Sequence, residues 1–222
     1  MNNPTINQYL ISTCLFIIDE FNEKYNLIRN NKPELKKIAD EQFNEMDICV
    51  RVGYPFRSMV HYTVGDSKKE KCKSNHDLYI ESKDFKIEIK YLKNWKSDSG
   101  TYSASKSWKE YQVDFNWLED EIKENKGKRA FVIGWFNCVE KFSQLVQLGS
   151  GKGSKPLVDE HKLVYFPFLR KLRSPAITTD LEYDYTVAYK SERLKSIGIE
   201  KSNIDCMFLG NENDAFHFAI YY

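Results

Sequence analysis

The chain has 222 residues, of which 41% are hydrophobic and 29% charged, and its formal net charge is +1. This composition is typical of a soluble globular protein and argues against disorder, while near-neutrality argues against a protein that coats nucleic acid regardless of sequence. Five scattered cysteines without a CxxC pair argue against a zinc-binding framework or a secreted disulfide scaffold, and a reducing cytoplasm is the expected location.

The N-terminal part of the chain predicts two helices. Residues 5–29 form the first, with Thr5 as its N-cap and a broad apolar face. The apolar run 9–18 is too short to span a bilayer, and no basic segment precedes it, so we expect no membrane segment. The second helix opens at Pro33, a residue suited to a first helical position, and runs to about Met46.

The middle of the chain changes to the shorter period of strands. Strands are predicted at residues 47–52, 58–64, 77–80, 85–91 and 129–136. A polar loop is expected at 65–75 and a helix at 108–123. This order predicts an α/β fold with a mixed central sheet flanked by helices.

The C-terminal third has weaker patterns. Residues 163–172 carry strand cues, 186–197 mix strand and helix cues, and 215–222 predicts a final strand. No linker divides the chain, so we expect a single domain over residues 1–222. Its core would span about 33–137, with a C-terminal extension, 138–222, that serves recognition or dimerisation.

The stretch from residue 75 to 90 predicts a hairpin with two different faces. The same residues stand opposite one another whether Ser82 and Lys83 form a two-residue turn or residues 81–84 form a loop. Apolar pairs then share one face, and on the other face Asp77 stands opposite Glu88.

Opposed carboxylates have Cβ atoms about 4.5–5.5 Å apart and destabilise a hairpin unless a cation lies between them. A hard divalent cation would resolve this conflict, and Lys90 points to the same face as Glu88. The competing interpretation is a solvated hairpin surface with alternating charges.

An Asp on one strand followed by Glu-x-Lys on the next resembles the PD-(D/E)xK nuclease superfamily, to which many type II restriction endonucleases belong. The resemblance rests on Asp77, Glu88 and Lys90 and covers about residues 33–137, whose element order is similar to the family's restriction-endonuclease-like αβββαβ core. His76 departs from the pattern, because the family name has proline there.

This resemblance implies Mg²⁺, or Mn²⁺ in its place, held by Asp77, Glu88 and the Ile89 carbonyl, with Lys90 assisting the attacking water. Members of the family often use another acidic residue from the preceding helix. Glu45, at the edge of the apolar stripe of the second predicted helix, is the best candidate. On the following helix, Lys106, Lys109 and Gln112 are candidates for phosphate contacts, or ordinary surface residues.

The expected function is therefore a divalent-metal-dependent endonuclease acting on double-stranded DNA, a type II restriction endonuclease above all. A duplex cutter that reads a palindromic site is expected to be a homodimer, since a two-fold site favours a two-fold protein. An RNA-cleaving or repair nuclease of the same fold remains open, as does a nucleic-acid-binding module without catalysis.

Overall fold

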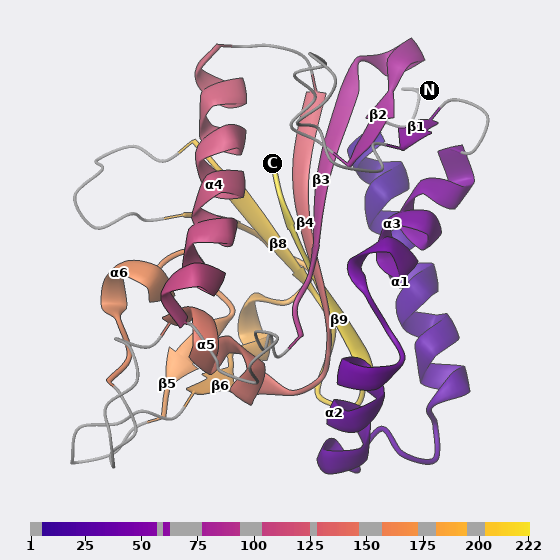
Figure 1. Ribbon diagram of the computed structural model, residues 1–222, viewed down its shortest axis with the longest axis vertical. Helices are drawn as coiled ribbons and strands as arrows, with labels where there is room; N and C mark the ends of the chain where they lie inside the picture. Colours follow the sequence, from indigo (N-terminus) through magenta and orange to yellow (C-terminus); the bar gives the residue numbers. More distant parts are fainter. Residues whose placement is uncertain are drawn as a thin grey trace.

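The protein has an α/β fold in which a seven-stranded mixed sheet lies between two groups of helices (Figure 1). The computed structural model describes residues 6–56, 60–62, 77–93, 104–124, 128–146, 157–172, 181–194 and 203–222. The strand order is β1-β2-β3-β4-β9-β8-β7. The predicted fold class, a mixed central sheet flanked by helices, is confirmed at this level.

Three helices cover one face of the sheet: α1 (Ile6–Lys24), α2 (Lys32–Glu41) and α3 (Glu45–Gly53). The first helix thus ends at Lys24 rather than at residue 29, and Thr5 lies outside the described residues. The predicted helix 33–46 is interrupted after Glu41. Across the described ranges, no helix combines the length and apolar character needed to cross a membrane.

The strand predicted at 47–52 is wrong, because these residues belong to helix α3. Its N-terminus is fixed by a capping box, in which the Asn44 side chain accepts from the Asp47 N–H and the Asp47 side chain accepts from the Asn44 N–H. Ile48 and Val52, four residues apart, are both fully buried. Helical spacing therefore buries Ile48 and Val52 on one side and leaves Val50, between them in the sequence, exposed.

The first four strands of the sheet position the candidate site. They are β1 (Val60–Tyr62), β2 (Leu78–Ile80), β3 (Phe85–Tyr91) and β4 (Lys128–Phe136). β1, β2 and β3 pair antiparallel, whereas β3 and β4 are parallel. A parallel pair needs a crossover connection, and helix α4 (Ala104–Lys123) lies in that connection. The predicted loop 65–75 lies outside the described residues.

The C-terminal extension completes the sheet with β7 (Ser191–Arg193), β8 (Asp205–Leu209) and β9 (Phe216–Tyr221). β9 pairs antiparallel with β4, which is buried over Ala130–Phe136. Of the strand suggested at 163–172, only β5 (Leu169–Lys171) forms, paired with β6 (Leu181–Tyr183). Residues 138–222 thus contribute to the core, and their role in recognition or dimerisation stays a prediction.

The other face of the sheet is covered by α4 together with two short helices, α5 (Ser143–Val146) and α6 (Glu160–Leu163) (Figure 1). Four short 3₁₀ helices lie in the connections: η1 (Tyr54–Phe56), η2 (Glu81–Lys83), η3 (Val139–Phe142) and η4 (Tyr185–Val187). The core on this face is rich in aromatic rings, and Trp135 of β4 stacks on Phe168 and Phe208. Each sheet face therefore has its own core, and β3 contacts both groups of helices.

Candidate active site

The hairpin formed by β2 and β3 has the predicted register. Leu78 pairs with Ile87 and Ile80 with Phe85, and all four side chains are fully buried. The connection is the four-residue loop 81–84, in which Asp84 adopts a left-handed conformation with φ 47°. Because alternate residues of a strand point to opposite faces, Glu88 and Lys90 point away from this core and toward α4.

Beyond Ile87, no strand of the described residues pairs with the outer edge of β3. Two carboxylates satisfy backbone groups along this edge: Asp77 Oδ2 accepts the Ile89 N–H at 2.8 Å, and Glu45 Oε2 accepts the Tyr91 N–H at 3.3 Å. In addition, the Asp77 N–H donates to the Ile87 carbonyl at 3.1 Å. The strand edge therefore holds Asp77 Oδ2 and Glu45 Oε2, and the other oxygen of each carboxylate takes no part in these two hydrogen bonds.

Glu45 reaches the site from the first turn of α3, although the sequence placed it near the end of the preceding helix. A carboxylate in the first turn is favoured by the positive end of the helix dipole. From there its side chain extends around the open edge of β3, where Glu45 Oε1 lies 3.7 Å from Lys90 Nζ. Glu45 thus lies beside Lys90 but on a helix other than the one predicted, and its role in the site stays a prediction.

Lys90 lies at the centre of the cluster. Its Nζ is 3.7 Å from Glu45 Oε1, 3.5 Å from Glu88 Oε1 and 3.6 Å from Asp114 Oδ2. The Lys90 side chain is only 20% exposed, and those of Glu88 and Asp114 are 12% and 10% exposed. One largely buried ammonium group thus faces three carboxylates at ion-pair distance.

The electrostatics of this cluster reflect burial and an excess of negative charge. Burial, followed by the charges of Asp77 and Asp114, raises the pKa of Glu88 to about 9. Burial also raises the pKa of Asp114 to about 7, although the Lys90 charge opposes this shift. Burial is the main cause that raises the pKa of both Asp77 and Glu45. Burial alone would lower the pKa of Lys90, but the surrounding carboxylates raise it above its usual value.

The donor set suits a hard divalent cation that keeps part of its water. Within the described ranges, no group of three or more His, Cys, Asp or Glu residues forms a ready metal-binding set. Mg²⁺, however, is usually held by one or two carboxylates, waters and substrate phosphates rather than by an all-protein cage. Asp77 and Glu88 supply two such carboxylates, and backbone donation from Ile89 orients the first. The Ile89 side chain is buried in the core, so only its carbonyl could contribute, and that contribution stays a prediction.

Asp114 of α4 is a member of the cluster that the sequence reasoning missed. It lies three residues after Tyr111 and four before Leu118, within the buried stripe of the helix. An acidic residue inside an apolar helical stripe was the available signal. The residues named instead on this helix, Lys109 and Gln112, are exposed, and the Lys106 side chain lies outside the described residues.

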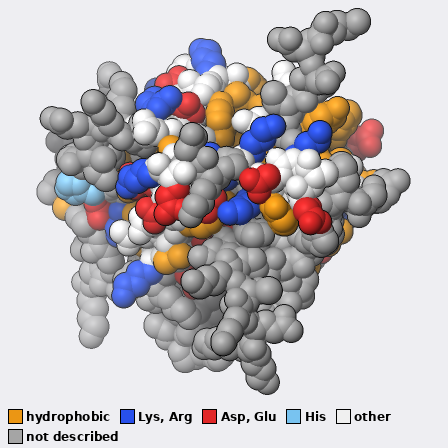
Figure 2. All heavy atoms as spheres, turned by 90° about the horizontal axis from the view of Figure 1, so that it is seen from above, with side chains coloured by type: hydrophobic (Ala, Val, Ile, Leu, Met, Phe, Trp, Pro, Cys, Tyr) orange, Lys and Arg blue, Asp and Glu red, His pale blue; other side chains and the backbone are white. Residues whose placement is uncertain are grey.

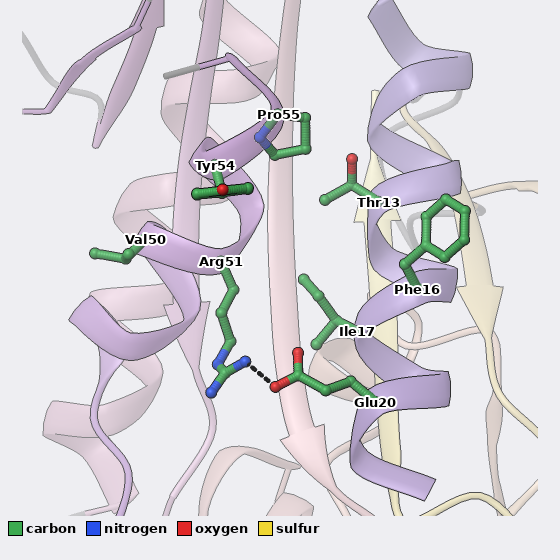
Figure 3. A pocket seen from close by; sticks show the side chains of 8 residues that line it. All are labelled: Thr13, Phe16, Ile17, Glu20, Val50, Arg51, Tyr54 and Pro55. Atoms are coloured by element: carbon green, nitrogen blue, oxygen red, sulfur yellow. Dashed lines mark hydrogen bonds and ion pairs between the residues drawn. The ribbon is translucent and has the colours of Figure 1, made fainter. Parts of the chain in front are cut away.

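A separate groove of about 410 Å³ lies between α1 and the end of α3 (Figure 3). An ion pair between Arg51 and Glu20 crosses it. At about 100° per residue, Val50 and Tyr54 lie on the side of α3 opposite Glu45. The groove therefore does not open into the Lys90 cluster. Its lining residues are Thr13, Phe16, Ile17, Glu20, Val50, Arg51, Tyr54 and Pro55.

On the face seen from above (Figure 2), the described side chains carry charges of both signs. Figure 2 shows acidic and basic side chains next to one another on the face seen from above. This arrangement agrees with the formal net charge of +1. The described surface on that face therefore does not form a continuous basic coat of the kind that binds nucleic acid without regard to sequence.

Comparisons of the chain with protein-family models, with curated proteins and with solved structures give no match. Function therefore has to be inferred from the side chains that the fold brings together. Of the predicted site residues, Glu45, Glu88 and Lys90 form one cluster, and Asp77 adjoins it on the same strand edge.

Proposed function

We propose that the protein is a divalent-metal-dependent endonuclease that hydrolyses phosphodiester bonds of double-stranded DNA, and that it is a type II restriction endonuclease. The observation that carries the proposal is the position of Lys90, 3.5 Å from Glu88 and beside Asp77 at an open strand edge. Paired carboxylates can hold a metal ion and a neighbouring lysine can stabilise growing negative charge, and both effects assist phosphodiester hydrolysis.

Asp77 and Glu88 would hold Mg²⁺, with Mn²⁺ as a substitute and the Ile89 carbonyl as a further ligand. When bound, the ion supplies positive charge to the phosphate oxygens and acidifies water. Glu45, fixed by the Tyr91 N–H, adds negative charge beside Lys90 and keeps that side chain protonated. Lys90 then donates hydrogen bonds to the attacking water and to the phosphate, where negative charge grows.

The order of elements also supports this proposal. From α3 to β4 the described residues form a helix, three strands, a helix and a strand in that order. This is the αβββαβ order of the restriction-endonuclease-like core that the sequence resembles. We further propose that the protein acts as a homodimer on a two-fold DNA site, since an isologous dimer matches a palindrome.

The proposal is tested by cleavage of a mixed-sequence duplex DNA in Mg²⁺. We expect discrete fragments from the native protein and none when a chelator is present. Asp77→Asn and Glu88→Gln should abolish the fragments, because each removes one charged oxygen ligand. Glu121→Gln is the matched control: it removes a carboxylate from the same helix–sheet interface, two turns of α4 beyond Asp114, and should cut normally.

The alternatives give different outcomes in the same assay. Cutting of RNA but not of DNA would move the proposal to a ribonuclease of the same fold. If duplex DNA, single strands and RNA all stay intact in Mg²⁺ and Mn²⁺, the protein is not a nuclease. Tight nucleic-acid binding without cleavage would then indicate a binding module.

A further inference from the structure

Asp114 occupies a position that packing does not explain. It lies on the buried side of α4, between Tyr111 and Leu118, and is 7% exposed. Its neighbours Tyr111 and Phe115 pack edge-on against Phe131 of β4, which fixes the helix on the sheet. Burying a carboxylate costs free energy unless the group is paired, so an apolar residue would serve packing better at this position.

The partner of Asp114 is Lys90. Its buried Oδ2 makes no hydrogen bond within the described structure, and Lys90 Nζ lies 3.6 Å away, at ion-pair distance. The other two carboxylates around Lys90 differ from Asp114 in role or in exposure. Glu88 is a proposed metal ligand, and the Glu45 side chain is 42% exposed. Of the three carboxylates around Lys90, Asp114 is therefore the one that is buried and is not a proposed metal ligand.

We infer that Asp114 is a positioning residue that holds the Lys90 ammonium against α4 and aims it at the reacting phosphate. This inference rests on the proposed function and extends it to a residue on a different element. Lys90 has four rotatable side-chain bonds, and attraction to Glu88 alone would draw it along its own strand. A fixed anion on α4 balances that attraction and keeps Nζ between strand and helix.

The first test measures the position of Lys90 without reference to activity. Native protein and Asp114→Asn are acetylated with a limiting amount of acetic anhydride, and the extent at Lys90 is compared with that at Lys86 by mass spectrometry. We expect Lys90 to be acetylated faster in Asp114→Asn, because the amine released from α4 becomes more accessible to the reagent. Glu121→Gln, which releases Lys86 instead, should raise the acetylation of Lys86 and leave that of Lys90 unchanged.

The second test measures whether Asp114 acts through Lys90. Asp114→Asn should lower kcat by about 10-fold to 100-fold with little change in KM, since misplacing a group that acts on the reacting atoms costs rate rather than binding. In a Lys90→Ala background the same change should alter the rate by less than about twofold. Asp114→Glu, which keeps the charge, should retain more activity than Asp114→Asn. Melting temperatures of all variants establish that each one is folded.

Unchanged acetylation of Lys90 in folded Asp114→Asn would overturn the inference. So would a rate loss that simply multiplies with that of Lys90→Ala, because Asp114 would then act independently of Lys90. If the native protein cleaves no nucleic acid, the proposed function fails, and the acetylation result alone still decides whether Asp114 positions Lys90.

Discussion

Two lysines on β3 face the same helix and yet have very different surroundings. Lys86 forms an ion pair with Glu121 of α4 at 3.1 Å, its one carboxylate partner within the described structure. Lys90, four residues along the strand, faces Glu45, Glu88 and Asp114 at 3.5–3.7 Å. Both lysines belong to the same strand and the same sheet face. Strand, face and burial therefore do not explain why Lys90 faces three carboxylates and Lys86 one.

The difference lies in the balance of charge. One ammonium and one carboxylate neutralise each other at Lys86. Among the described residues at Lys90, four carboxylates including Asp77 surround one ammonium, and protons or a further cation would balance the remaining negative charge. Burial and the neighbouring carboxylates raise the pKa of Glu88, which favours a proton on this group when no cation is bound. A neutral ion pair such as Lys86–Glu121 stabilises the structure, whereas a cluster with excess negative charge, as at Lys90, is suited to binding a cation.

The largest predicted effect is the difference in DNA cleavage between a variant without Lys90 and a variant without Lys86. Lys90→Met should lower single-turnover DNA cleavage by about 10²-fold to 10³-fold, the usual loss when one donor to a developing charge is removed. Lys86→Met should leave cleavage unchanged within about twofold, because its partner is far from the reacting groups. Rates measured with enzyme in excess test this, and equal losses in the two variants would remove the distinction between the lysines.

The second prediction concerns stability against pH in metal-free protein. The pKa of Glu88 is about 9 when folded and near 4.5 when unfolded, so between these values the folded state binds more protons. Stability should therefore fall as pH rises from about 5 to 9, with a slope of up to about 1.4 kcal/mol per pH unit for one proton. Asp114 adds a slope of the same sign up to its pKa of about 7.

Urea unfolding at several pH values in chelator measures this slope. Glu88→Gln cannot ionise and should show a flatter profile, above all between pH 7 and 9. A native profile that rises over this range, or one that Glu88→Gln does not flatten, would mean that Glu88 ionises normally in the folded protein.

Added Mg²⁺ should stabilise the folded protein by a smaller amount. A ligand at about 100 times its dissociation constant adds about 2.7 kcal/mol to the free energy of unfolding. The increase should be larger at pH 8 than at pH 6, since protons on Glu88 compete with the ion. Thermal melts with and without Mg²⁺ test this. Asp77→Asn and Glu88→Gln should lose most of the increase and Glu121→Gln none, so a uniform increase in all four proteins would point to a different metal site.

The sequence predicted those parts of the fold and site that local patterns determine. The β2–β3 register follows from alternation, because a one-residue slip would turn Asp77, Glu88 and Lys90 into the apolar core and turn Leu78 and Ile87 out of it. Segment 47–52 was assigned to a strand because Ile48, Val50 and Val52 alternate, and apolar spacing of two and of four overlap in so short a run. The capping box at Asn44 and Asp47 would have distinguished the two.

The parts that could not be predicted depend on tertiary contacts. Glu45 enters the site by bonding the open edge of β3, and nothing near residue 45 in the sequence indicates that Tyr91 offers a donor there. Asp114 is recognisable as an acid in an apolar stripe, but its partner is set by how α4 crosses β3. Strand β9 lies beside β4 through pairings such as Phe131 with Tyr221, which join residues distant in the sequence, and local patterns carry little information on such pairings.

The smallest predicted effect concerns the Lys86–Glu121 pair itself. Its side chains are 26% and 14% exposed, and partly exposed pairs contribute about 0.2–1 kcal/mol. Replacing both residues, as Lys86→Met with Glu121→Leu, should change the free energy of unfolding by no more than about 1 kcal/mol and leave cleavage intact. A double-mutant cycle by urea unfolding measures the coupling energy. A coupling of several kcal/mol, or a loss of cleavage in the double variant, would show that this end of the interface also serves the site, because a purely structural pair can be exchanged for apolar contacts without affecting the chemistry at Lys90.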